Sequence, residues 1–283
     1  MAMDEKGLGK RLQKARQDAG LTQQELCQRS GLSYSTLAKI ERGAIKSPSI
    51  FTIQKIADTI GIDLDALVSG NTSRIRQRKK SKSGVSFIYF DVNGCIVHFF
   101  NRAFTELAHL SGKPSDLIES FFWHYNDQIC RGEYSVEDFN RELAKMLGID
   151  SVDWKEYYFN AIEPIKDAYD LILWASEHYK IGLLTNSMPG FLEELMARDI
   201  VPNIKYDSII DSSKVGHIKP ELEIFKVAEK AALCMPEEIL SIDDSRANLM
   251  AAEKLGWHVS WFDDYNSAES VSRIRNLLEP TSS

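Results

Sequence analysis

After residue 84 the chain alternates short apolar runs with longer amphipathic stretches, and this alternation constrains the fold more than any other feature. Apolar runs short enough to be single buried strands lie at residues 85–90, 181–184, 208–210, 239–242 and 258–262. Stretches with helical spacing lie between them, at about 167–178, 190–198, 221–232 and 246–255. Strands that alternate with helices predict a parallel sheet with helices on both faces. We therefore expect a Rossmann-like α/β core within residues 85–283.

Polar residues follow three of these runs at the point where each strand would end. The first run leads into Asp91, the second into Thr185, and the fourth into Asp243 and Asp244. Lys219 precedes a further helix. Because ligands bind beyond the carboxyl ends of parallel strands, we expect these side chains to meet on one rim.

Such a set of side chains suits phosphoryl transfer. A carboxylate can attack phosphorus and form an aspartyl-phosphate, and Mg²⁺ prefers carboxylate oxygens together with phosphate and water. Lysine and threonine can hold the oxygens of the transferring group. An aspartate at a strand end can also serve merely as the cap of the next helix. The prediction therefore rests on the whole set and on its order.

The four segments resemble the motifs of the haloacid dehalogenase superfamily, over residues 85–265. They are FIYFDVNGCIV, Thr185-Asn186-Ser187, GHIKPELEIF and Asp243-Asp244. By this resemblance Asp91 is the nucleophile and a Mg²⁺ ligand, and Asn93 offers its backbone carbonyl to the metal. Asp244 binds Mg²⁺ directly, while Asp243 binds it through water or orients the site. The resemblance thus implies Mg²⁺ as cofactor.

The same resemblance assigns the phosphate side of the site. Thr185 and Lys219 are the other catalytic residues, and both bind phosphate. Backbone N–H groups near Gly94 and Asn186 complete the phosphate cradle. The partner implied for this part of the chain is a phosphorylated small molecule.

Asn93 departs from most phosphatases of the superfamily, which have aspartate two residues after the nucleophile. That aspartate protonates the leaving oxygen and then activates water. General acid–base catalysis is worth about 10²–10⁴-fold, so its loss could leave a slow enzyme or a sensor. The sugar-phosphate branch often lacks this aspartate as well, so the motif alone leaves activity open. Deamidation of the Asn93-Gly94 pair, which would regenerate an acid, is a further hypothesis.

Residues from about 99 to 162 are helical and separate the first motif from the second. In SVEDFNRELAKMLG (135–148) we expect a helix that begins with a capping box from Ser135 to Asp138. In the superfamily such an insertion is a helical cap over the active site. With RGEYSVEDF and IDDSRANLMAAEKLG, the layout resembles sugar-phosphate phosphatases and the N-terminal domains of soluble epoxide hydrolases.

Residues 1–68 instead predict an all-α domain of short amphipathic helices. We expect helices at about 7–19, 22–30, 33–43 and 49–60, and a short fifth from Asp63. Thr22 and Glu25 have the spacing of a capping box. A tight turn at Gly31 would join the second and third helices as a helix-turn-helix. The runs LTQQELCQRSGLSYSTLAKIERG and PSIFTIQKIADTIGIDLDALV resemble the DNA-binding domains of the lambda-repressor and Cro family.

In that family the third helix lies in the major groove. The DNA-binding residues that the resemblance implies are Gln23, Ser33, Tyr34, Ser35, Lys39 and Arg42. Gln23 would contact phosphate, Lys39 suits guanine, and Arg42 either contacts phosphate or is merely solvated. Arg16 and Glu41 could look like DNA contacts, but we expect them to pair inside the domain. A helical protein-interaction module is the competing interpretation of these residues.

The charge distribution favours a nucleic-acid partner for the first part of the chain. Residues 1–84 carry 16 Lys and Arg against 8 Asp and Glu, whereas residues 85–283 carry 18 against 33. This split predicts a polyanion-binding head on an acidic body. Residues 69–84, SGNTSRIRQRKKSKSG, lack apolar periodicity and predict a basic flexible linker. The linker either adds salt-sensitive phosphate contacts or is a solvated tether.

Membrane and secretory classes are disfavoured. No apolar run approaches the roughly 20 residues of a membrane span, the N-terminus lacks a signal peptide, and the scattered cysteines suit a reducing cytoplasm. We expect a cytoplasmic regulator that binds a double-stranded operator as a homodimer. Its body would bind Mg²⁺ and a phosphorylated small molecule as a sensor or slow phosphatase. The alternatives are an active sugar-phosphate phosphatase that the head localises or regulates, and a phosphatase whose head binds protein.

Overall fold

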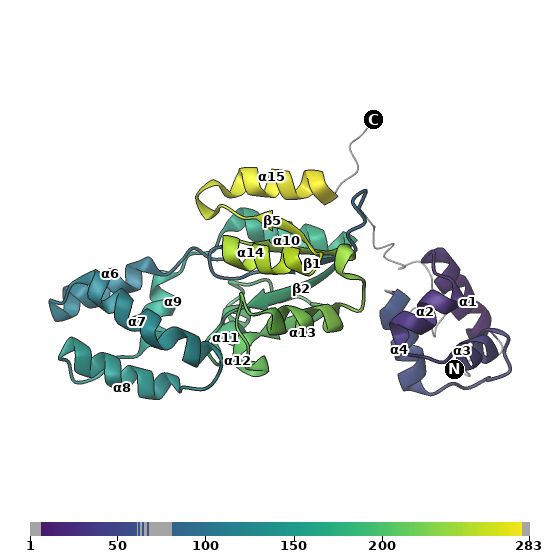
Figure 1. Ribbon diagram of the computed structural model, residues 1–283, viewed down its shortest axis with the longest axis horizontal. Coiled ribbons are helices and arrows are strands. Elements are labelled where there is room, and N and C mark those ends of the chain that lie inside the picture. Colours follow the sequence, from purple (N-terminus) through teal and green to yellow (C-terminus); the bar gives the residue numbers. More distant parts are fainter. Residues whose placement is uncertain (1–6, 61, 63, 65–66, 68–80, 279–283) are drawn as a thin grey trace. The chain divides into compact units, whose positions relative to one another are not determined.

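The chain divides into two compact units, residues 1–79 and residues 80–283. The computed structural model describes residues 7–60, 62, 64, 67 and 81–278 (Figure 1). Each unit has a hydrophobic core of its own, as separate domains do. None of the described helices combines the length and apolar character that crossing a bilayer requires.

The first unit contains the four longer helices that the sequence predicts. They are α1 (Leu8–Asp18), α2 (Gln23–Ser30), α3 (Tyr34–Glu41) and α4 (Ile50–Ile60). The capping box is confirmed: the Thr22 hydroxyl accepts from the Glu25 backbone N–H, and the Glu25 carboxylate accepts from that of Thr22. Gly31 takes a φ of 68°, which lets α2 end and the chain turn into α3. The fifth helix expected from Asp63 falls largely outside the described residues.

The second unit is built on the predicted parallel sheet. Its strands are β1 (Phe87–Phe90), β2 (Lys180–Thr185), β3 (Ser208–Asp211), β4 (Ile239–Asp243) and β5 (His258–Trp261). They lie in the order β3-β2-β1-β4-β5, and every pairing is parallel. Phe90, the last residue of β1, is in register with Leu183 on one side and Ile242 on the other. The three strand ends that carry the predicted site residues are therefore neighbours.

Helices cover both faces of this sheet. Ile88 and Phe90 pack in one apolar cluster with α10 (Lys166–His178) and α15 (Ser267–Leu278). Phe87 and Tyr89 pack in a second cluster with α13 (Leu222–Ala232) and α14 (Arg246–Lys254). Because successive strand side chains point to opposite faces, β1 is buried on both sides and reads as a continuous apolar run.

Shorter helices complete this unit. Two of them, α11 (Phe191–Ala197) and α12 (Ser212–Val215), follow β2 and β3. Single turns of 3-10 helix, η2 (Pro236–Glu238) and η3 (Asp264–Asn266), precede β4 and α15.

Four helices between β1 and β2 occupy the stretch expected to be a cap. They are α6 (Asn101–Ser111), α7 (Ser115–Cys130), α8 (Val136–Leu147) and α9 (Trp154–Ala161), and Figure 1 shows them gathered together. Phe104, Phe122, Phe139 and Trp154 form their shared aromatic core. The capping box expected at α8 forms only in part. Ser135 accepts from the Asp138 N–H, but its hydroxyl donates to the Asp138 carboxylate, which is one methylene shorter than glutamate.

Residues 81–84, the last four of the expected linker, form a turn. The Gly84 N–H donates to the Ser81 carbonyl, and the Ser81 hydroxyl accepts from the Val85 N–H at 3.0 Å. Residues 69–80, the rest of the expected linker, lie outside the described residues.

Candidate active site and DNA-binding head

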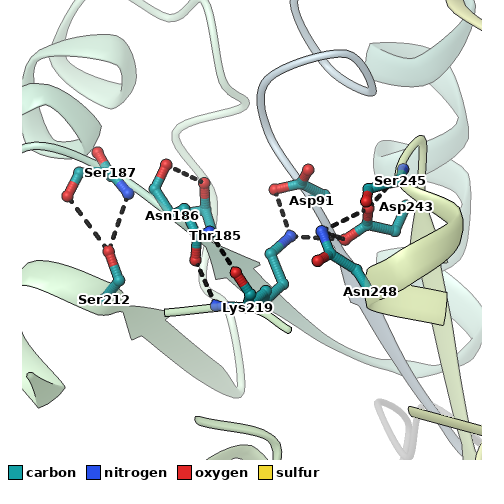
Figure 2. A network of polar contacts seen from close by, with 9 residues as sticks. All are labelled: Asp91, Thr185, Asn186, Ser187, Ser212, Lys219, Asp243, Ser245 and Asn248. Carbon is teal, nitrogen blue, oxygen red and sulfur yellow. Dashed lines mark hydrogen bonds and ion pairs between the residues drawn. The ribbon is translucent and has the colours of Figure 1, made fainter. Parts of the chain in front are cut away.

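Lys219 is the centre of a buried ionic cluster at the carboxyl edge of the sheet. Its Nζ lies 2.8 Å from an Asp91 carboxylate oxygen and 2.6 Å from an Asp243 oxygen (Figure 2). Burial opposes the charge of the ammonium, but the Asp243 and Asp91 carboxylates outweigh that effect and raise its pKa. The lysine is therefore held charged between the ends of β1 and β4.

Asn186 holds the segment that presents this lysine. The Lys219 backbone N–H donates to the Asn186 side-chain oxygen at 2.7 Å, and the Asn186 amide donates to the Lys219 carbonyl at 2.9 Å. Because Asn186 directly follows β2, this reciprocal pair ties the Lys219 segment to the sheet (Figure 2). The sequence predicted a backbone role for Asn186 but gave no signal for this side-chain role.

Asp243 is surrounded by hydrogen-bond donors. Besides Lys219, its oxygens accept from the Ser245 backbone N–H at 2.8 Å and from the Asn248 amide at 2.9 and 3.2 Å. Of the two roles left open for Asp243, these contacts favour the orienting one. Sequence reasoning missed Asn248, although its position one turn into the helix after Asp243-Asp244 offered a signal.

Asp91 and Asp244 form the acidic half of the site. One side-chain atom from each of Asp91, Cys95 and Asp244 lies within 4.8 Å of the others. Burial raises the pKa of Asp91 to about 7. The positive charge of Lys219 opposes this rise, whereas the negative charges of Asp243 and Asp244 add to it. Asp244 is exposed at one side, but partial burial and then the Asp243 charge raise its pKa to about 6. Two carboxylates so placed favour a cation between them.

The donor set fits Mg²⁺ better than a softer metal. Carboxylate oxygens are the ligands that Mg²⁺ prefers. Burial and then the Asp91 charge raise the pKa of the Cys95 thiol well above its usual range, which disfavours the thiolate form that a softer metal prefers. Gly94 has a φ of 81° and no side chain, which allows the Asp244 carboxylate to lie against its backbone. A Cβ atom at position 94 would lie 2.2 Å from an Asp244 carboxylate oxygen.

Asn93 contacts the cap. Its side-chain oxygen accepts a hydrogen bond of 2.7 Å from the hydroxyl of Tyr158 on α9. Tyr158 is buried, and burial followed by the nearby Asp91 charge raises its pKa. Sequence reasoning gave no role to Tyr158, which lies 65 residues away along the chain.

The Thr185 hydroxyl, which the sequence predicts to bind phosphate, makes only a weak contact. Thr185 is buried at the end of β2, and among the described residues its hydroxyl contacts the Asn186 carbonyl alone, at 3.5 Å. That distance exceeds an ordinary O–H···O bond, so the hydroxyl is able to turn to a phosphate oxygen. The phosphate-binding roles of Thr185, Gly94, Asn186 and Lys219 stay predictions.

In the first unit the predicted DNA-facing residues lie mainly on the outer side of α3. Tyr34 is 55% exposed, and Ser35, Lys39 and Arg42 are exposed as well. The Ser33 hydroxyl caps α3 by accepting from the Thr36 N–H. Contact of any of these with DNA stays a prediction.

Arg16 and Glu41 pair inside the domain, as expected. The Arg16 guanidinium donates to both Glu41 oxygens, at 2.7 and 3.0 Å, and both side chains are buried. Gln23, expected at a phosphate, donates to the same carboxylate at 2.7 Å. The carboxylate thus links α1, α2 and α3.

Residues 85–256 match the family model of haloacid dehalogenase-like hydrolases, which covers more than half of the chain. The chain belongs to this family. Over 205 residues it is 27% identical to D-ribitol-5-phosphate phosphatase of Bacteroides thetaiotaomicron, a match of 68% of this chain and 97% of that enzyme.

Solved structures show the same fold. A haloacid dehalogenase family enzyme of B. thetaiotaomicron, an Asp-to-Ala mutant in complex with magnesium and inorganic phosphate, superposes with a TM-score of 0.55 at 21% identity. That alignment covers 63% of this chain and 94% of the enzyme. A hydrolase-like protein of Porphyromonas gingivalis gives a TM-score of 0.56 at 24% identity, over 68% and 98% of the two chains.

Residues 12–67 match the helix-turn-helix family, so this hydrolase-family chain also carries a helix-turn-helix DNA-binding domain. Over 69 residues it is 39% identical to the transcriptional regulator PuuR of Escherichia coli. The match covers 24% of this chain and 37% of PuuR, well under two thirds of that regulator.

Proposed function

We propose that this protein is a transcriptional regulator whose hydrolase-like domain binds Mg²⁺ and a phosphorylated small molecule as a sensor or slow phosphatase. The observation that carries the proposal is the pairing of Lys219 with Asp91 and Asp243, beside Asp244. The cluster supports the proposal because an ammonium and carboxylates are the groups that binding of phosphate and Mg²⁺ would require. Asn93, in contrast, stands where an acid would be needed for fast turnover.

The chain's own groups suggest how a phosphomonoester would be handled. An Asp91 oxygen would attack phosphorus, the bond from phosphorus to the leaving oxygen would break, and an aspartyl-phosphate would form. Lys219 and Thr185 would hold the phosphoryl oxygens. Asp91 and Asp244 would hold Mg²⁺, which supplies positive charge to the phosphoryl group when bound.

The proton needed by the leaving oxygen limits the reaction. Asn93 is an amide, and its oxygen already accepts from Tyr158. Without a side-chain acid at this position, water would have to protonate the leaving oxygen. Loss of general acid–base catalysis slows such a step by about 10²–10⁴-fold. A ligand that binds and turns over slowly suits the role of an effector.

An active sugar-phosphate phosphatase is the second candidate. The similarity to D-ribitol-5-phosphate phosphatase, which extends over 97% of that enzyme, favours it. In this case the helix-turn-helix domain would localise or regulate the enzyme.

Mg²⁺-dependent phosphate release distinguishes the two candidates. Full-length protein and its Asp91→Asn variant would be assayed on phosphosugars and a generic aryl phosphate. Wild-type turnover as fast as that of ordinary phosphatases, together with its loss in Asp91→Asn, would support the active enzyme. Negligible turnover, with inorganic phosphate and Mg²⁺ still protecting the protein against heat, would support the sensor.

On the DNA side we propose a homodimer on a double-stranded operator with two-fold symmetry. The exposed residues of α3 and the excess of basic residues before residue 85 support this. Phosphate neutralisation releases counterions, so affinity should fall steeply with salt. Absence of salt-dependent affinity for any duplex, including DNA upstream of the protein's own gene, would rule out the regulator.

A further inference from the structure

Arg131 of the cap contacts the segment of the core that carries Lys219. It follows the last residue of α7, and its guanidinium forms an ion pair with the carboxylate of Glu221, two residues after Lys219. Both side chains are partly buried, and the hydrogen bond to Glu221 raises the pKa of Arg131. The contact joins residues 90 positions apart in the chain.

Glu221 in turn closes the loop in which Lys219 lies. Its carboxylate accepts from the Ile218 backbone N–H at 3.2 Å, and its own backbone N–H donates to the Ile218 carbonyl at 2.9 Å. Burial opposes the charge of Glu221, but the hydrogen bonds from Arg131 and from the Ile218 N–H outweigh burial and lower its pKa. The carboxylate therefore stays charged while it joins the two ends of this loop.

The backbone of Arg131 is itself placed by the core. The next residue, Gly132, has a φ of 73°, and a Cβ atom there would lie 2.9 Å from the Ser213 carbonyl oxygen of α12. A side chain at this position would push the cap away from the core. Because the backbone approaches so closely, the Arg131 side chain reaches Glu221 from a fixed starting point.

The loop around Lys219 is thus held from two sides. On the side of β2, the Asn186 side chain pairs with both backbone groups of Lys219. On the side of the cap, Arg131 holds Glu221. The Lys219 side chain is only 2% exposed, and its ammonium lies within 2.8 Å of two carboxylates. A small shift of the loop would therefore disturb the position of this ammonium.

We propose that Arg131 is a positioning residue for Lys219 that acts through Glu221, so that the position of the cap sets the affinity of the core for a phosphoryl group. The inference rests on the proposed function, in which Lys219 binds phosphate, and it adds a cap residue to that site. Arg131 acts here through the hydrogen bonds of Glu221 and not by touching the ligand. Its effect on phosphate binding should therefore not follow its charge.

Two variants of opposite charge separate positioning from simple electrostatics. Arg131→Met removes a positive charge, and Glu221→Met removes a negative charge close to it. Electrostatic attraction alone predicts that the first variant weakens the binding of inorganic phosphate and that the second strengthens it. Positioning predicts that both weaken it, by about threefold to tenfold, as expected for the loss of one hydrogen bond. The double variant should be no weaker than either single variant, because both changes break the same link.

Binding of inorganic phosphate in the presence of Mg²⁺ would be measured by thermal shift on the full-length protein. The matched control is Lys155→Met, which removes another ion pair between cap and core, from Lys155 to Glu194 at 2.7 Å. The side chains of that pair are about as exposed as those of Arg131 and Glu221, but Glu194 lies on α11 and not on the Lys219 loop. We expect the control to lower the melting temperature and to leave phosphate affinity unchanged.

Amide hydrogen exchange gives a second readout that needs no ligand. Arg131→Met should speed the exchange of the Ile218 N–H, because the Glu221 carboxylate that accepts from it loses its partner in the cap. Lys155→Met should leave the exchange of this N–H unchanged.

Tighter phosphate binding by Glu221→Met would overturn the inference while leaving the proposed function intact. Unchanged phosphate affinity in Arg131→Met, or unchanged exchange of the Ile218 N–H, would overturn it as well. Failure of inorganic phosphate to bind the wild-type protein would instead overturn the proposed function. The exchange of the Ile218 N–H would then decide by itself whether Arg131 positions the Lys219 loop.

Discussion

Tyr158 of the cap donates a hydrogen bond of 2.7 Å to the side-chain oxygen of Asn93, two residues after Asp91. The contact joins the cap to the position at which related phosphatases carry their acid. The Asn93 amide accepts this hydrogen bond through its oxygen, and it cannot act as an acid that protonates a leaving group. We therefore expect the rate of any turnover at this site to respond to a change of this side chain.

Asn93→Asp should accelerate Mg²⁺-dependent phosphate release by about 10²–10⁴-fold, because a carboxyl can exchange the proton that the amide cannot. Initial rates on the best substrate would be compared with those of wild type and Asn93→Ala. An aspartate variant no faster than the alanine variant would show that proton transfer does not limit the reaction.

Lys219→Met should lower the free energy of unfolding by about 3–5 kcal/mol near neutral pH, because it leaves the buried Asp91 and Asp243 carboxylates without their cation. Chemical denaturation measures this. The matched control is Lys214→Met, whose ion pair with Glu193 is about half exposed and is worth about 0–1 kcal/mol. Similar losses in both variants would contradict a central structural role for Lys219.

Stabilisation by Mg²⁺ should grow as the pH rises from about 5 to about 8, because metal binding requires deprotonated ligands. The pKa of Asp91, about 7, and that of Asp244, about 6, both lie above the ordinary value of 3.8. Without metal, the raised pKa values mean that the folded protein favours the neutral carboxyl groups. Their contribution to folding stability is fully present below pH 3.8 and is lost as the pH rises through about 6 and about 7. Melting temperatures with and without Mg²⁺ would show this, and a shift that is constant with pH would argue against these two ligands.

Lys39→Ala should relax base preference by about 1–3 kcal/mol at one base pair of the operator, because lysine suits the guanine edge. Binding to an operator and to its single-base variants would be measured at several salt concentrations. Lys55→Ala, an exposed lysine on α4, is the matched control. Unchanged discrimination in Lys39→Ala would remove this residue from base recognition.

Asn93 should remain an amide on storage. Deamidation requires the Gly94 nitrogen to attack the Asn93 side chain, but that N–H donates to the Val97 carbonyl at 2.7 Å within a tight turn. Peptide mass spectrometry of fresh and aged protein measures this. Conversion of Asn93 to aspartate in the folded protein would revive the hypothesis that the acid is regenerated.

Local patterns in the sequence determined most of the architecture. The strand–helix alternation predicted all five strands to within about two residues at either end, since periodicity reports burial directly. The Thr22–Glu25 capping box was predictable because it forms between residues three apart. The order of Asp91, Thr185, Lys219 and Asp243-Asp244 indicated the rim, because the carboxyl ends of neighbouring parallel strands share one edge of the sheet.

Only the tertiary structure decided how those groups are held. The hydrogen bonds of Asn186 to the Lys219 backbone, of Asn248 to Asp243 and of Tyr158 to Asn93 join different elements. No local pattern encodes such pairs, because they depend on the packing of helices against strands far apart in the chain. The sequence could predict which residues lie on one rim of the sheet, but the arrangement of the cap over that rim was decided by the tertiary fold.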